Sequence, residues 1–69
     1  MVEVFKTNVL QTEQSHFLAN QIASYLPGAL INFDLEDCDK ILRIEADDIS
    51  SQIIIDLLNN HGFQAEMLI

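Results

Sequence analysis

Residues that cross-link, kink or break a chain are scarce in this sequence. Its one cysteine, Cys38, cannot form an internal disulfide, which is typical of reducing compartments, so we expect a cytoplasmic protein. Two glycines and one proline, beside 49% hydrophobic residues, argue against disorder and for a packed core. A chain of 69 residues forms one domain, residues 1–69, and has no room for a second.

Positive charge is equally scarce. Lysine and arginine together number 3 against 11 aspartates and glutamates, which gives a formal net charge of −8. Because such a field repels phosphate backbones and anionic lipids, we expect no nucleic-acid partner and no membrane partner. No apolar run approaches the ~20 residues of a membrane span, and residues 1–5 lead directly into a strand without a basic leader. We expect a soluble, unprocessed chain that attracts cations or a basic partner.

The sequence does contain a clear hydrophobic periodicity, which alternates between a period of 2 and a period of 3.6. The elements that it predicts are strands at residues 2–7, 31–35, 42–46 and 63–67, and helices that begin near Thr12 and near Asp47 or Asp48. Thr12 and one of the two aspartates are the expected N-caps. Pro27-Gly28 and His61-Gly62 are expected to end the helices.

The order β-α-β-β-α-β is the split βαβ arrangement of ferredoxin-like domains. Two helices with one apolar stripe each must cover a common sheet face, which predicts an α+β two-layer sandwich. Right-handed crossovers then favour an antiparallel sheet with strand order 4-1-3-2. The residues expected in its core are Val4, Leu18, Ile22, Phe33, Leu35, Leu42, Ile44, Ile54 and Leu58.

Several short motifs follow the order of a known family. They are Val9 after the first strand, Leu26-Pro27-Gly28, Asn32-Phe33-Asp34-Leu35, and His61-Gly62-Phe63-Gln64-Ala65. In this order and spacing, the chain resembles the heavy-metal-associated domains of copper chaperones and metal-transporting ATPases over nearly its whole length. The resemblance implies the ferredoxin-like fold that the periodicity also predicts.

The metal motif of that family is missing. The family binds copper(I) or another soft ion with two cysteine thiolates spaced Cys-x-x-Cys, which are the ligands that soft ions prefer. When the chain is aligned on Val9, these positions are Gln11 and Gln14, whose neutral amides are weak ligands. The resemblance therefore implies a domain that has lost copper binding and holds no cofactor.

Catalytic motifs are also missing. The sequence has no glycine-rich phosphate loop and no nucleophile elbow. A small domain with a filled core also leaves little room for a small-molecule substrate. We predict a non-catalytic binding or interaction module rather than an enzyme.

A metal or cation site at the loop end of the sheet is the alternative function. In the predicted topology the loops that carry His16, Cys38, Asp39 and His61 lie at one end, and these residue types suit zinc, nickel or copper(II). A plainer interpretation is that the aspartates around Cys38 form a turn and that His61 suits a helix C-terminus.

The sheet edges are the second candidate surface. The predicted edges are the second and fourth strands, and exposed edges are templates for pairing. The last three residues, Met67, Leu68 and Ile69, either complete the core or form an interface with a protein partner or a second copy. Asp34 and Glu36 on the second strand discourage self-pairing there through like charge.

Overall fold

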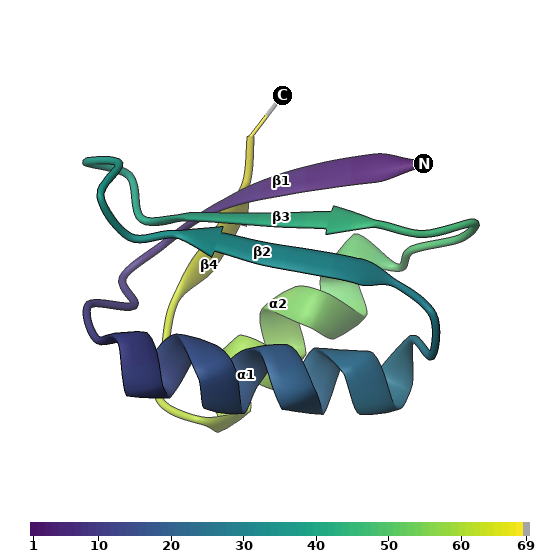
Figure 1. Ribbon diagram of the computed structural model, residues 1–69, viewed down its shortest axis with the longest axis horizontal. Coiled ribbons are helices and arrows are strands. Elements are labelled where there is room, and N and C mark those ends of the chain that lie inside the picture. The colour runs from purple at the N-terminus through teal and green to yellow at the C-terminus, as the bar shows by residue number, and fades with distance from the viewer. Residues whose placement is uncertain (69) are drawn as a thin grey trace.

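The computed structural model describes residues 1–68 and contains the six predicted elements in the predicted order (Figure 1). They are β1 (Val2–Thr7), α1 (Thr12–Tyr25), β2 (Leu30–Asp34), β3 (Ile41–Glu45), α2 (Ser51–Asn60) and β4 (Ala65–Met67).

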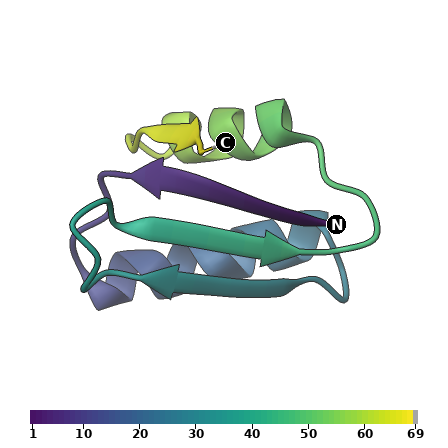
Figure 2. The ribbon, with the colours of Figure 1, turned by 90° about the horizontal axis from the view of Figure 1, so that it is seen from above.

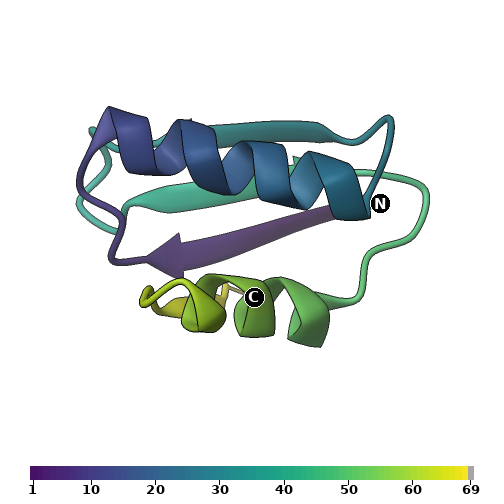
Figure 3. The ribbon, with the colours of Figure 1, turned by 90° about the horizontal axis from the view of Figure 1, so that it is seen from below.

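The four strands form one sheet in the order β2-β3-β1-β4, and all neighbouring pairs are antiparallel. This is the predicted order read from the other edge, so the prediction of a ferredoxin-like two-layer fold is confirmed. Both helices lie on one face of the sheet, with α1 packed against β2 and α2 against β4 (Figures 1 and 3). No described element covers the opposite face (Figure 2), which we call the open face.

The core lies between the sheet and the two helices. Its buried apolar residues are Phe5, Val9, Leu18, Ile22, Leu42, Ile44, Ile49, Ile54 and Leu58, which confirms the prediction for Leu18, Ile22, Leu42, Ile44, Ile54 and Leu58. Phe33 and Leu35 are half-buried and pack against this cluster. Their partial exposure follows from the position of β2 as an edge strand, which has a neighbouring strand on one side only.

The prediction that Val4 lies in the core is wrong. In the register of the sheet, Phe5 pairs with Leu42, whereas Val4 pairs with Arg43. Paired residues share a face and successive residues alternate, so Phe5 lies on the helix side and Val4 on the open face. One face of β1 carries the apolar side chains of Val2 and Val4, and the other carries that of Phe5. Alternation alone therefore does not show which face of the strand is buried.

The start of α1 also differs from the prediction. Gln11, rather than Thr12, is the N-cap residue. Its carbonyl accepts the first helical hydrogen bond, from the Ser15 N–H at 3.1 Å. Thr12 is therefore the first residue of the helix rather than its cap.

The predicted cap of α2 is wrong for a different reason. Ser50 is the N-cap, and Asp47 and Asp48 lie in the preceding loop. This start places Ile49 just before the cap and Ile54 at the fourth helical position, and both side chains are buried in one cluster. A hydrophobic contact between these two positions fixes the angle at which a chain enters a helix. Burial of Ile49 thus sets the helix start.

Both predicted helix stops are confirmed, and each uses a glycine with positive φ: 87° at Gly28 and 86° at Gly62. After α2, the Phe63 N–H donates to the Leu58 carbonyl at 2.9 Å and the Gly62 N–H to the Asn59 carbonyl at 3.0 Å. This pair of bonds is the Schellman motif, which satisfies carbonyls at a helix end and turns the chain toward the next strand.

Candidate functional site

Three connecting segments meet at one end of the sheet. The Thr7 N–H donates to the Asp39 carbonyl at 3.1 Å, and the Thr7 hydroxyl donates to the Lys40 carbonyl at 2.6 Å. The Gln64 N–H donates to Asn8 Oδ1 at 2.8 Å. These bonds join the β1–α1 loop to the β2–β3 hairpin and to the segment before β4. The prediction that the three segments share one end is confirmed.

Gln11 and Gln14, which the predicted resemblance places at the positions of the metal motif, cap the start of α1. The Gln11 N–H donates to Gln14 Oε1 at 3.3 Å, so the third helical residue reaches back to the N-cap backbone. This is one half of a capping box, which satisfies an N–H that the helix itself leaves free. Val9, just before them, is fully buried. Gln11 and Gln14 thus have a structural use that needs no metal.

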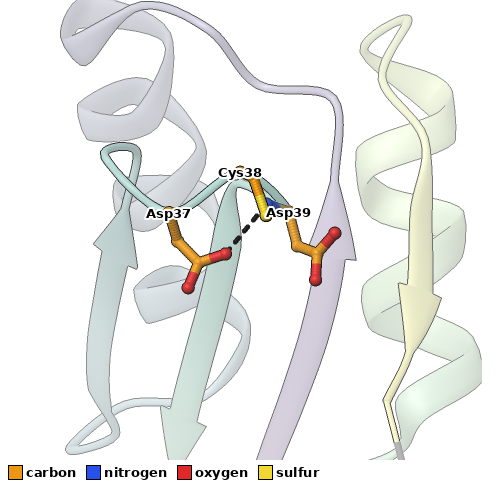
Figure 4. A group of neighbouring side chains, drawn as sticks. All are labelled: Asp37, Cys38 and Asp39. Carbon is orange, nitrogen blue, oxygen red and sulfur yellow. Dashed lines mark hydrogen bonds between the residues drawn. The ribbon is translucent and has the colours of Figure 1, made fainter.

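The tip of the hairpin holds a group of three metal-ligand side chains, Asp37, Cys38 and Asp39, whose ligand atoms lie within 4.8 Å of one another (Figure 4). The Asp39 N–H donates to Asp37 Oδ1 at 2.8 Å, and the Lys40 N–H donates to the Asp37 carbonyl at 3.0 Å. These bonds are those of an aspartate-stabilised turn. Asp39 also lies 3.8 Å from Lys6 Nζ in an exposed ion pair of small energetic weight.

The two histidines predicted to join Cys38 and Asp39 lie elsewhere. His61 packs edge-on against Phe17, with ring centroids 4.9 Å apart and planes at 85°. His16 lies on α1 and faces β2. Among residues 1–68, the group at the hairpin tip is the one set of three or more such ligands that lie this close together, and neither histidine belongs to it.

A groove lies between α1 and the edge strand β2, with a volume of about 480 Å³. Its lining residues are Thr12, Ser15, His16 and Ala19 from α1, and Ile31, Asn32, Phe33, Asp34, Leu35 and Glu36 from β2 and its end. Ser15 and Ala19 are small and one helical turn apart, so they leave space opposite the strand. The sequence predictions did not include this groove, although small residues four apart beside an alternating strand were a signal for it.

The groove combines an apolar floor with an acidic rim. Ile31, Phe33 and Leu35 are half-buried, while the Asp34 and Glu36 side chains are exposed. No lysine or arginine occurs among the described residues that line it. An occupant would therefore meet apolar contacts below and negative charge along the edge.

The backbone of β2 turns hydrogen-bonding groups toward its free edge. The Ala46 N–H donates to the Met1 carbonyl at 3.0 Å, which fixes the phase of hydrogen bonding along β3. Successive residues of a strand direct their N–H and C=O groups alternately to the neighbour on one side and on the other. Because Ala46 bonds to the chain at β1, Arg43 bonds to β2, and its partner Asn32 bonds to β3. Ile31 and Phe33 then direct their N–H and C=O groups away from the sheet, to an edge that no described strand occupies.

The other edge, β4, is where the sequence predicts an interface or the completion of the core. Met67 pairs with Phe5 and so lies on the helix side, whereas the next residue, Leu68, lies on the open face and donates its N–H to the Val4 carbonyl at 2.8 Å. Both side chains are 39% exposed. Ile69, the third residue of that prediction, lies outside the described residues.

In the part of the chain that the structure describes, these surfaces define a small α+β domain with two exposed sheet edges and one uncovered sheet face. Within residues 1–68, no helix has the length and apolar character to cross a membrane. Compared with known protein families, curated proteins and solved structures, the chain shows no significant match in any of the three. The resemblance to heavy-metal-associated domains therefore rests on the sequence motifs and stays a prediction.

Proposed function

We propose that this domain is a non-catalytic interaction module that binds an extended segment of a partner protein along the free edge of β2. The observation that carries the proposal is the combination, on one strand, of outward-facing backbone groups at Ile31 and Phe33 with an adjacent groove. Addition of a strand to an exposed sheet edge is a common mode of peptide recognition. Backbone hydrogen bonds supply affinity in this mode, and side-chain pockets supply specificity.

The groove selects the chemistry of the partner segment. Alternate residues of an added strand would point into the groove and contact the half-buried side chains of Ile31, Phe33 and Leu35. The intervening residues would lie near Asp34 and Glu36 on a molecule of net charge −8, which favours lysine or arginine there. The partner segment is therefore extended, with alternating apolar and basic residues.

An NMR titration tests this proposal. The probe is a blocked hexapeptide of alternating lysine and valine, and its control carries glutamate in place of lysine. We expect the lysine peptide alone to shift the amide resonances of Ile31 and Phe33 and to slow their hydrogen exchange. Equal responses to both peptides, or shifts confined to other elements, would contradict the proposal.

A matched pair of variants separates the groove from the overall charge. Glu36→Lys should weaken binding of the lysine peptide severalfold, because it removes a negative charge from the groove rim and adds a positive one. Asp47→Lys makes the same change of charge in the β3–α2 loop. It should have a smaller effect that salt removes, since it acts only through the long-range field.

Cation binding at the hairpin tip is a second candidate function, which the closeness of Asp37, Cys38 and Asp39 favours. A thiolate and carboxylates suit zinc better than copper(I). If this group binds zinc, saturating zinc should raise the melting temperature by several degrees, since binding to the native state alone stabilises it. Cys38→Ser should abolish the rise, and an unchanged melting temperature in the parent protein would exclude this function.

The other elements of the proposal come from the sequence. The capping use of Gln11 and Gln14 supports the view that these positions bind no soft metal, and the likeness to heavy-metal-associated domains rests on the sequence motifs. The free, exposed Cys38 supports a reducing, cytoplasmic setting. Mass spectrometry of the protein isolated under native conditions, which reports bound metal and the state of the thiol together, tests both.

A further inference from the structure

The open face of the sheet differs in charge from the rest of the molecule. The registers place eleven described residues on it: Val2, Val4 and Lys6 from β1, Leu30, Asn32 and Asp34 from β2, Ile41, Arg43 and Glu45 from β3, and Glu66 and Leu68 from β4 and its end. Two basic and three acidic side chains among them give a charge of −1. The whole chain carries −8, so the remainder carries −7.

The same face exposes apolar side chains that no described element covers. Leu30 is 67% exposed, Val2 43% and Leu68 39%, and Val4 and Ile41 are half-buried. Val4 lies near the centre, with Arg43 beside it on β3 and Leu68 beside it on β4. Charges of both signs lie among these apolar side chains, because Glu45 pairs with both Leu30 and Val2, and Arg43 pairs with Val4.

We infer that the open face binds a second copy of this chain, face to face. Two copies that each carry −8 repel each other wherever acid meets acid, so association favours the face where the charge nearly cancels. On that face, Lys6 and Arg43 of one copy can meet the glutamates or Asp34 of the other, as a self-complementary interface requires. Only two basic side chains on this face make nucleic acid or anionic lipid a poorer occupant.

The size of the face predicts a weak dimer. Eleven residues are fewer than the roughly 20–30 per partner of a standard interface, which places this one among small, transient interfaces. We expect a dissociation constant on the order of 100 µM. Added salt should tighten it, because salt screens the repulsion between the acidic remainders while the apolar contact persists. This surface shares Asn32 and Asp34 with the border of the β2 groove, but its apolar side chains at Val2, Val4 and Leu68 lie outside the groove, so either proposal can fail without the other.

Sedimentation equilibrium between about 10 µM and about 1 mM protein, repeated at low and high salt, tests the inference. The test variant is Leu30→Lys, and its control is Leu10→Lys in the β1–α1 loop, where the leucine is 70% exposed against 67% for Leu30. Both variants change the net charge equally and leave the core intact. We expect the parent and Leu10→Lys to dimerise, and the dissociation constant of Leu30→Lys to rise at least tenfold.

NMR spectra recorded over the same concentrations locate the interface. The amides of Val4 and Arg43 should shift with concentration in the parent and shift much less over the same range in Leu30→Lys. A protein that remains monomeric at 1 mM overturns the inference, as does equal association of the two leucine variants. Concentration-dependent shifts confined to the free edge of β4, at Ala65 and Met67, also overturn it, since they would mark edge pairing instead. The inference is also overturned if the protein does not self-associate and the open-face amides shift instead when another ligand is added. The two ligands tested are a uridine decanucleotide and vesicles of 30% phosphatidylserine in phosphatidylcholine.

Discussion

The two edge strands, β2 and β4, differ in length and in the side chains beside them. β2 has five residues and borders a groove of about 480 Å³ with an apolar floor of Ile31, Phe33 and Leu35. β4 has three residues, and the hollow of about 390 Å³ beside it is lined by Ala65 and otherwise by polar side chains. Both edges turn backbone groups outward, but only β2 offers an added strand enough length and an apolar surface.

This difference shows that an exposed edge is not by itself a binding site. Short edge strands are one way in which proteins prevent unwanted pairing, and β4 fits that description. On β2, Asp34 and Glu36 discourage pairing with a second copy of β2, because like charges would meet. The same two residues attract a basic segment, so one feature both prevents self-pairing and selects a partner.

The largest expected difference between the two edges concerns stability. Phe33→Ala should lower the free energy of unfolding by about 2–3 kcal/mol, toward the lower end for phenylalanine because the side chain is half-buried. Met67→Ala, at a side chain that is 39% exposed, should cost about 1 kcal/mol or less. Urea unfolding of both variants checks this. Equal losses would mean that the two edges contribute alike to the core.

The connections into the two edges should, by contrast, behave alike. Gly28 precedes β2 and Gly62 precedes β4, both have positive φ, and a Cβ at either would meet no atom within 4 Å. Gly28→Ala and Gly62→Ala should therefore each cost about 1 kcal/mol through backbone strain alone. Asparagine tolerates this conformation better, so Gly62→Asn should cost less, and thermal melts of the three variants compare them. A much larger loss at one glycine would reveal a contact that the backbone conformation does not explain.

The element order and sheet topology could be predicted because their signals are local. The Pro27-Gly28 and His61-Gly62 stops and the apolar periods lie within single elements, and together they leave few topologies. Local signals could not show which face of β1 is buried. Val4 and Phe5 are both apolar, and the choice between them depends on pairing with β3, which is far away in the sequence.

The candidate sites were harder to predict for the same reason. The predicted strand order placed the β1–α1 loop, the hairpin and the segment before β4 at one end of the sheet, and the structure confirms this. Strand order does not show, however, in which direction a side chain points. Those directions separate His16, which lines the groove, and His61, which packs on Phe17, from Cys38 and Asp39. The groove itself depends on how closely α1 approaches β2, which periodicity does not encode.

A smaller effect is expected at the start of α1, away from both edges. Gln14→Ala removes the acceptor of the Gln11 N–H and should cost roughly 0.5 kcal/mol, the low end for a capping contact because the pair is exposed. Gln21→Ala, at an exposed position of the same helix, should be nearly neutral. Chemical denaturation of the two variants under identical conditions measures the difference. If the Gln21 variant loses as much stability, the capping contact has no measurable weight.

The smallest expected effect is that of copper(I), which should leave the melting temperature of the parent protein unchanged. Soft ions need thiolates, and Gln11 and Gln14 hold the positions that the predicted alignment on Val9 assigns to the thiolates of heavy-metal-associated domains. A competition titration against a copper(I) chelator should therefore leave the metal with the chelator.

The double variant Gln11→Cys/Gln14→Cys should take copper(I) from the chelator, because the two positions lie three residues apart at the start of α1, on the chain that follows the buried Val9. As a control, Gln21→Cys places a single thiol farther along α1 and should not compete. Tight copper(I) binding by the parent would show that other ligands replace the missing thiolates, and failure of the double variant to bind would mean that the alignment on Val9 is wrong.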